Sequence, residues 1–285
     1  PPVASDGRSI QDDTGNSTTY PRWAYWQPVQ GKGSSKIVWN FRNTPLDYND
    51  FVALLNDSFV IEGVKITVVG TGDFIAHENA NAPLFDALDE LFQIPGAFVF
   101  GSNDYYAPKF KNPFSYLKSD HGERKLGKKL PVETLRSRFI SNGWFDLNNE
   151  KCETKVKNIK LELRGTDDAH LELDNYENVS GKRDSNCDLS IGVTHAPYLR
   201  VISTMAKDNL DLIFAGHTHG GQIRLPWFSG SKALTTNCDL PNWRSRGLTK
   251  LSTEPWLNVS AGVGYSPYAP IRFACPPEVS LITIT

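Results

Sequence analysis

Long hydrophobic runs are absent from this chain of 285 residues. No stretch approaches the roughly 18 consecutive apolar residues that a membrane-spanning helix needs, so we expect no transmembrane segment in this chain. An excess of charge of one sign is also absent, because 30 Lys and Arg residues stand against 32 Asp and Glu residues. Nucleic-acid-binding proteins usually carry a basic face, so the balanced charge argues against a nucleic-acid partner and against a nuclease.

Cysteine is scarce, with four residues at positions 152, 187, 238 and 275. None belongs to a Cys-x-x-Cys pair, which argues against a zinc ribbon. The spacing would permit two local disulfides, and it suits four buried thiols as well. We favour free thiols, because a chain of this length buries a core without covalent cross-links.

What is present is typical of a globular protein, with 39% hydrophobic and 22% charged residues. Residues 1–35 are rich in Ser, Thr, Gly, Asp and Pro, which predicts an irregular N-terminal lead. Residues 36–285 are predicted to form a single domain, with a cap or excursion at about 105–150 where Lys, Asn and Pro accumulate.

Apolar periodicity in the predicted domain alternates between strand and helix patterns, which is typical of an α/β sheet protein. Strands are predicted at residues 36–39, 64–69, 96–100, 189–193, 211–215, 256–259 and 279–284. Helices are predicted at residues 50–55, 82–92, 132–139 and 199–210, and a hairpin within residues 151–175.

Polar side chains that bind metals follow several of these strands at the point where each strand ends. Asp73 and Asn103 come after the strands at 64–69 and 96–100, His195 after 189–193, and His217 and His219 after 211–215. The carboxyl ends of neighbouring parallel strands meet at one edge of a sheet. Imidazole, carboxylate and amide oxygen are suitable ligands for Zn, Mn or Fe, so a metal site is predicted there.

Each of these residues also has a plainer interpretation. His217 and His219 could be two surface histidines on a turn, and Asp73 could be a helix N-cap. Gly216, Gly220 and Gly221 bracket the histidine pair after a buried strand, which favours metal ligation. A histidine such as His195, taken alone, is more often a hydrogen-bonded core residue. It becomes a ligand candidate because the other candidate ligands also follow strand ends.

Four blocks in this order resemble the calcineurin-like metallophosphoesterase superfamily. They are Gly72-Asp73, Gly101-Ser-Asn-Asp104, Thr194-His195-Ala-Pro197 and Gly216-His-Thr-His-Gly-Gly-Gln222. The stretches 98–108 and 266–275 are similar to an actinobacterial branch of that superfamily. The resemblance covers about residues 36–285 and implies a two-sheet α/β sandwich flanked by helices, from a bacterial source, in the cytoplasm or the cell envelope.

The resemblance also implies an activity and a site. Two divalent metals share a bridging carboxylate and a water or hydroxide that attacks phosphorus, and the metals neutralise the phosphoryl oxygens. Asp73 would be the bridging ligand, and Asn103, His195 and His217 would hold one metal. His219 would help to hold the other. Asp73, Asn103, Asp104 and His217 are the predicted catalytic residues.

Two departures from the family pattern bear on the activity. An Asp-x-His block is expected after the first strand, and Asn40 and Arg42 stand at its two positions. Asn is a poorer ligand than a carboxylate, and Arg does not ligate because it stays protonated. Arg42 could instead contact a substrate phosphate, with Asn40 beside it, or it could pair with a nearby acid such as Asp73.

The second departure is Gly-Ser-Asn-Asp in place of Gly-Asn-His-Asp, so either Asn103 or Ser102 takes the ligand position. The family histidine that assists the leaving group is missing. Its role would fall to water or to another histidine, such as His77 or His170.

Two functions follow from these observations. The first is a phosphoesterase with one or two Mn, Fe or Zn ions per chain, acting on a small phosphorylated substrate, either a phosphodiester or a phosphomonoester. The second is a degenerate relative that binds a phosphorylated ligand or a single metal without turnover. The sequence leaves the substrate, the metal and the oligomeric state open.

Overall fold

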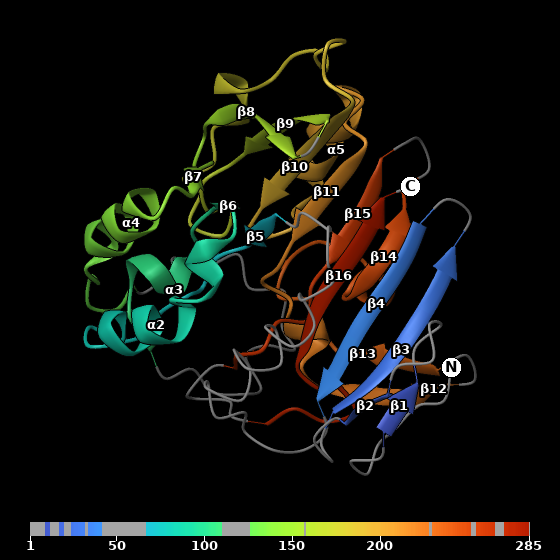
Figure 1. Ribbon diagram of the computed structural model, residues 1–285. Coiled ribbons are helices and arrows are strands. Elements are labelled where there is room, and N and C mark those ends of the chain that lie inside the picture. The colour runs from blue at the N-terminus through green and yellow to red at the C-terminus, as the bar shows by residue number, and fades with distance from the viewer. Residues whose placement is uncertain are drawn as a thin grey trace.

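Two β-sheets face each other at the centre of the protein, and helices cover their outer sides (Figure 1). This arrangement comes from a computed structural model, which describes the backbone of residues 9–11, 17–19, 24–31 and 34–41, and residues 67–109, 126–156, 158–227, 230–251, 255–265 and 271–284.

The larger sheet has six strands in the order β14-β15-β11-β10-β9-β8. Its four central strands are parallel to one another, and each edge strand is antiparallel to the strand beside it. The strands are β8 (Lys151–Val156), β9 (Ile159–Gly165), β10 (Leu189–Thr194), β11 (Leu212–Ala215), β14 (Gly247–Lys250) and β15 (Trp256–Val259). Because β9, β10 and β11 are parallel, the loops that follow them lie at one edge of the sheet.

The smaller central sheet has three parallel strands, β5 (Val68–Gly70), β6 (Gly96–Phe98) and β7 (Phe145–Asp146). Ala97 of β6 and Val99, just after β6, pack against Leu163 of β9 and Val193 of β10, and all four side chains are fully buried. This interface brings the loops after β5 and β6 next to the loops after β10 and β11.

Helices cover the outer face of each sheet. Helices α2 (Asn81–Leu88) and α4 (Val132–Ser141) pack on the smaller sheet around Phe92 and Phe139, and helix α5 (Leu199–Lys207) packs on the larger sheet through Ile202 and Met205 (Figure 1). The predicted α/β fold with a two-sheet sandwich flanked by helices is therefore confirmed. The helices predicted at 82–92, 132–139 and 199–210 and the hairpin within 151–175 are also observed.

Further strands lie outside the central sandwich. A three-stranded antiparallel sheet has the order β16-β4-β3, and β1 pairs with β2. A hairpin is formed by β12 (Arg224–Trp227) and β13 (Gly230–Ala233). The other strands are β1 (Ser9–Gln11), β2 (Ser17–Thr19), β3 (Ala24–Gly31), β4 (Ser34–Phe41) and β16 (Glu278–Ile284).

One expectation is wrong, one observed feature was not expected, and one expectation is not tested. The predicted irregular lead at 1–35 contains β1, β2 and β3, because cross-strand pairing orders segments whose polar composition carries no strand pattern. The β12–β13 hairpin was not predicted, since its strands are short and contain Pro226 and Gly230. The helix predicted at 50–55 lies outside the described residues.

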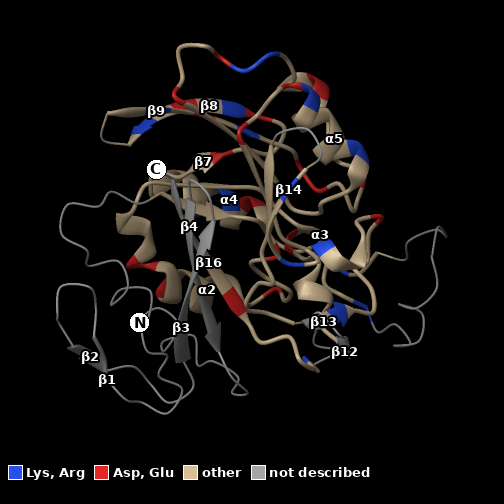
Figure 2. Ribbon diagram, turned by 90° about the vertical axis from the view of Figure 1, so that its right-hand side faces the viewer, with Lys and Arg blue, Asp and Glu red and all other residues tan. Residues whose placement is uncertain are grey.

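Short helical segments complete the described fold: η1 (Leu91–Gln93), α3 (Ser102–Tyr105), η3 (Tyr176–Asn178), η4 (His219–Gly221) and η5 (Asn242–Arg244). All four cysteines are free thiols, as the composition favoured. Across the described ranges, no helix combines the length and apolar character needed to cross a bilayer. Segments of Lys and Arg and of Asp and Glu are both scattered over the described ribbon (Figure 2).

Candidate metal centre

Asp73 lies at the centre of the candidate site, in the loop that follows β5. Its Oδ1 accepts a hydrogen bond from the Asn103 backbone N–H at 2.9 Å, and its Oδ2 accepts one from the Asn103 side-chain amide at 2.8 Å. The His195 Nε2 lies 3.5 Å from Oδ2. Of the two alternatives left open by the sequence, Ser102 and Asn103, it is the Asn103 side chain that contacts Asp73.

Glycines allow this close approach. Asp73 has φ of 59° and Gly72 has φ of 87°, so the turn after β5 passes through the left-handed region. A Cβ atom at Gly101 would lie 2.3 Å from Asp73 Oδ1 and 2.5 Å from His195 Cε1. The loops after β5, β6 and β10 therefore meet at a spacing that a larger residue at position 101 would disrupt.

The two imidazoles of the site have their tautomers set by backbone carbonyls. His195 Nδ1 donates a hydrogen bond to the Thr71 carbonyl at 2.6 Å, which leaves the Nε2 lone pair facing the site when the ring is neutral. His217 Nε2 lies 3.2 Å from the Asn237 backbone carbonyl and 3.4 Å from the Asn237 side-chain amide, and in the tautomer that donates to the carbonyl the Nδ1 lone pair faces inward. These two inward nitrogens, His195 Nε2 and His217 Nδ1, are 3.2 Å apart.

Two lone pairs beside a carboxylate repel one another unless a positive charge lies between them. Burial lowers the pKa of His195, but the attraction of Asp73 outweighs it and raises that pKa to about 10. Burial and the repulsion of His170 and His195 hold the pKa of His217 well below its usual range. A proton on His195 satisfies the arrangement, and a divalent cation would bind the same inward atoms, so the donor set fits a metal ion.

Asp73 itself is held in the ionised form. Burial by itself would raise the pKa of Asp73, but the attraction of His195 and hydrogen bonds from His195 and Asn103 bring it far below its usual range. An ionised carboxylate with hydrogen-bonded partners is the form that a divalent cation requires.

His219 follows His217 on a strained loop. His217, His219 and Gln222 have φ values of 65°, 49° and 47°, a conformation that residues other than glycine rarely adopt. His219 Nδ1 donates to the Gly264 carbonyl at 3.1 Å, which leaves its Nε2 available as a ligand atom. Burial and the repulsion of Arg272 lower the pKa of His219, which favours the neutral form that binds metals.

Two arginines donate hydrogen bonds to backbone carbonyls of this loop, and the sequence analysis identified neither of them. Arg272 donates through Nη1 to the His219 carbonyl and through Nη2 to the Ala261 carbonyl. Arg224 donates through Nη1 to the Gly220 carbonyl at 2.6 Å. Neither arginine forms a recognisable sequence motif with His217 and His219, so only the folded structure shows that they support the loop.

Asp104 binds the backbone of the site. Its side chain is fully buried and accepts hydrogen bonds from the N–H groups of Asp73, Ile75 and Gly101 at 2.8, 3.0 and 2.9 Å. Burial and then the negative charge of Asp73 raise the pKa of Asp104 to about 7. Its contacts hold the loops after β5 and β6 together.

His170 lies at the edge of the site, whereas His77 does not. The His170 and His217 ring centroids are 4.5 Å apart, and His170 Nδ1 lies 3.0 Å from the Tyr198 hydroxyl. Asp168, fully buried, accepts the His170 backbone N–H at 3.0 Å. The position of His170 after β9 is a strand-end signal of the same kind as that of His195. His77 is exposed, with its Nδ1 bonded to the Asn79 backbone N–H.

Asn40 and Arg42 stay predictions. The backbone of Asn40 belongs to β4, where it pairs with Glu278 of β16, and its side chain is outside the described part of the structure. Arg42 lies outside the described residues altogether.

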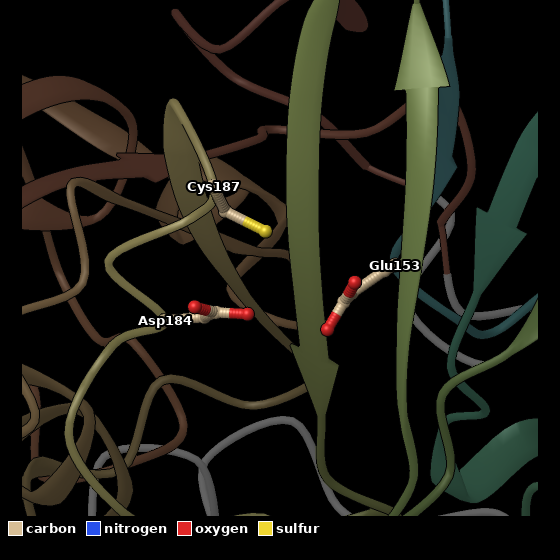
Figure 3. Close-up of side chains that lie close together, drawn as sticks. All are labelled: Glu153, Asp184 and Cys187. Carbon is tan, nitrogen blue, oxygen red and sulfur yellow. The ribbon is translucent and has the colours of Figure 1, made fainter.

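A second group of metal-binding side chains lies elsewhere. Glu153 of β8, Asp184 and Cys187 bring their ligand atoms within 4.8 Å of one another (Figure 3). The group lies near the amino end of β10, whereas the Asp73 cluster follows the carboxyl ends of β10 and β11. Asp184 Oδ1 already accepts the Asn186 backbone N–H, and Glu153 is exposed, so we assign no ion there.

Comparison with known proteins identifies the class to which this fold and site belong. Residues 44–221 match the calcineurin-like phosphoesterase family. Because the match spans more than half of the chain, the chain belongs to this family of metal-dependent phosphoric ester hydrolases, which bind divalent metals and act on phosphorylated substrates. The affinity to an actinobacterial branch stays a prediction.

Three individual proteins are similar to this chain over part of its length. YpbG of Bacillus subtilis, an uncharacterised protein, is 26% identical over 197 residues, which are 68% of this chain and 60% of YpbG. An uncharacterised metallophosphoesterase of Aquifex aeolicus is 25% identical over 219 residues, covering 76% of this chain and 72% of that protein. The UDP-2,3-diacylglucosamine pyrophosphatase LpxG of Chlamydia trachomatis is 39% identical over 75 residues, 25% of this chain and 22% of LpxG. The chain thus spans about 60% of YpbG.

Proposed function

We propose that this protein hydrolyses phosphoric esters at a divalent-metal centre formed by Asp73, Asn103, His195 and His217. The observation that carries the proposal is the convergence of three metal-binding side chains, Asp73, His195 and His217, on one point. His195 Nε2 lies 3.5 Å from Asp73 Oδ2 and 3.2 Å from His217 Nδ1, and backbone carbonyls fix both imidazole orientations. A metal ion would be Mn, Fe or Zn, because the donors are imidazole, carboxylate and amide oxygen.

A divalent cation at this centre supplies a water of lowered pKa and neutralises charge on the phosphoryl group. The protein residues do the rest of the positioning. Asp73 keeps its charge and orients the Asn103 amide, and Asp104 holds the two loops in register as a positioning residue. His170 borders His217, where it would face the substrate side of the site. His219 would help to bind a second metal. Asn40 and Arg42 stand at the two positions where the family pattern has the other ligands of that metal.

The substrate class is a small phosphodiester or phosphomonoester. The pyrophosphatase activity named for LpxG, which is similar over 75 residues, supports a phosphorus–oxygen bond as the bond that is cleaved. The single domain of residues 36–285 and the cap at about 105–150 are part of the same proposal.

The alternative function is binding of a phosphorylated ligand without turnover. The observation that favours it is the pair Asn40 and Arg42, because a guanidinium matches phosphate oxygens and repels a metal ion. The double substitution Asn40→Asp/Arg42→His would then create hydrolysis in a chain that has none. Turnover of generic phosphodiesters by the unmodified chain at ordinary enzymatic rates would exclude this alternative.

The first test compares metal content and hydrolysis in four proteins. The unmodified chain, His217→Ala, Asp73→Asn and the control His77→Ala are equilibrated with Mn²⁺, analysed for metal per chain, and assayed on bis(p-nitrophenyl) phosphate and p-nitrophenyl phosphate. Loss of a ligand should cost more than the roughly 10–100-fold known for outer-shell partners. His77→Ala should match the unmodified chain, since His77 is exposed and outside the site.

The outcomes separate the two functions. One or two metals with hydrolysis that both ligand variants lose supports the hydrolase. Bound metal without hydrolysis supports the binding alternative. Full hydrolysis by His217→Ala or Asp73→Asn would refute the proposed centre.

A further inference from the structure

The β12–β13 hairpin exposes apolar side chains to solvent on one face and buries a charged side chain on the other. Cross-strand partners share a face, so Ile223, Leu225, Lys232 and Leu234 lie together on one side of the hairpin. The aliphatic side chains among them are 38%, 48% and 39% exposed for Ile223, Leu225 and Leu234. Arg224, which points to the opposite face, is buried. Three large aliphatic side chains thus face solvent while an arginine is turned inward.

The apolar row continues on a third segment beside β12. Phe273 forms a parallel bridge with Ile223, and its backbone exchanges hydrogen bonds with Gln222 and Arg224. Phe273 is 54% exposed, and Ile271, two residues earlier on the same side, is 62% exposed. Leu234, Ile223 and Phe273 therefore lie side by side across three extended segments.

An aromatic side chain with a cation on it borders this row. Trp243 in η5 is 60% exposed, and the Arg244 guanidinium lies 4.5 Å from the centre of its ring. The Asn242 side-chain amide donates to the Leu234 carbonyl, which joins η5 to the hairpin. We call the exposed set the apolar face; its members are Ile223, Leu225, Leu234, Trp243, Ile271 and Phe273.

Two cationic side chains accompany the apolar face: Lys232 is the cross-strand partner of Leu225, and Arg244 lies over Trp243. Between residues 221 and 250 the chain carries Lys232, Arg244, Arg246 and Lys250 in addition to the buried Arg224, while Asp239 is the sole acidic residue. The Asp239 carboxylate accepts the Leu199 backbone N–H at the start of α5. The chain as a whole has a formal net charge of −2, so this excess is local. Aliphatic side chains, an exposed tryptophan and cations are the combination that binds the interface of an anionic bilayer.

The apolar face is continuous with the candidate metal centre. Arg272, between Ile271 and Phe273, donates to the His219 carbonyl. The segment after Leu234 leads to Asn237, whose carbonyl faces His217 Nε2. The inner sides of the same segments hold the ligand loop, and their outer sides form the apolar face.

We infer that the apolar face is a docking surface for an anionic lipid bilayer, which holds the metal centre next to the membrane surface. Ile271 and Phe273 supply buried apolar area, Trp243 lies at the interface, and Lys232 and Arg244 attract the headgroups. If the proposed function holds, on which this last step rests, the phosphoester substrate is presented at or near a membrane.

The test is co-sedimentation of the full, Mn²⁺-equilibrated chain with vesicles of phosphatidylcholine alone, or with about one third phosphatidylglycerol added. The unmodified chain should bind the anionic vesicles, and binding should weaken as salt is raised. Ile271→Ser/Phe273→Ser should bind about tenfold or more weakly, because two apolar side chains no longer enter the interface. Lys232→Ala should reduce binding by about fivefold, the effect of one cation near an anionic surface.

The matched control is Ile140→Ser/Ile159→Ser, which removes two isoleucines that are 51% and 47% exposed on α4 and β9. It should bind like the unmodified chain. Thermal unfolding shows whether each variant is folded. If the double variant at 271 and 273 does not fold, Trp243→Ser, on a separate segment, tests the same surface.

Failure to bind anionic vesicles, or equal binding by the folded variants of the apolar face, would overturn the inference. So would a concentration-dependent dimer in light scattering that the same variants abolish, since the face would then bind a second copy. Vesicle binding is measured without turnover. A chain that binds vesicles and hydrolyses nothing therefore refutes the proposed function and leaves this inference intact.

Discussion

Gly101→Ala is the substitution that tests most directly whether the loops meet as described. The added Cβ would lie 2.3 Å from Asp73 Oδ1, 2.5 Å from His195 Cε1 and 2.6 Å from His195 Nδ1. Contacts shorter than 3.0 Å essentially never occur for a Cβ atom, so the carboxylate or the backbone must move by roughly 0.7 Å. The Asp73 carboxylate cannot move freely, because two hydrogen bonds from Asn103 hold it. The His195 ring on the other side of the added methyl group is buried and cannot move away either.

The expected cost has two parts. Insertion of one methyl group into a packed site destabilises a protein by about 1–3 kcal/mol. Displacement of a reacting geometry by about 1 Å costs on the order of 100-fold in rate. We therefore expect Gly101→Ala to lower metal occupancy and to reduce phosphodiester hydrolysis on the order of 100-fold, while the fold is retained.

The assay measures metal per chain, hydrolysis of bis(p-nitrophenyl) phosphate and thermal unfolding in parallel. Gly264→Ala is the matched control, because a Cβ there meets nothing within 4 Å and the backbone hydrogen bonds of Gly264 are kept. Hydrolysis and metal content of Gly101→Ala equal to those of the control would refute the crowded arrangement of Asp73, Gly101 and His195.

Three further predictions concern the supports of the site and of the fold. Arg272→Gln should lower metal affinity by about 10–100-fold, measured by titration with Mn²⁺, because the His219 carbonyl loses its hydrogen bond from Arg272; unchanged affinity would contradict this role. Arg164→Ala should reduce the free energy of unfolding in urea by about 3–5 kcal/mol, since Arg164 is 2% exposed and its loss leaves Glu162 buried without its partner. The pH dependence follows from Glu162, whose pKa burial would raise but hydrogen bonds from Ser190, the Asp184 backbone and Arg164 lower overall. A lowered folded-state pKa stabilises the protein above the unfolded value of 4.5, and this contribution is lost as pH falls through the folded value. Glu162→Gln should therefore flatten the loss of stability below about pH 4.5, and an identical acid profile in both proteins would refute this.

The sequence by itself determined the α/β class and the residues that could bind metal. A ligand at the end of an apolar strand is a local signal, because the strand pattern and the residue that follows it are adjacent in the chain. Asp73, Asn103, His195 and His217 were all found this way, and the family match agrees with the class. The order of the four sequence blocks and the glycines around His217 likewise indicate a metal site.

Only the tertiary structure decided which of these residues meet, and what holds them. Asp104 binds the backbone of Asp73 across 31 positions, and Arg272 reaches the His219 carbonyl across 53 positions, so no local pattern marks either contact. The choice of His170 over His77 likewise depends on the packing of the loop after β9 against His217. The roles of Asn40 and Arg42 stay predictions from the sequence. Local chemistry selects candidates from neighbouring residues, whereas burial and long-range contacts select among those candidates, because both depend on the whole chain being folded.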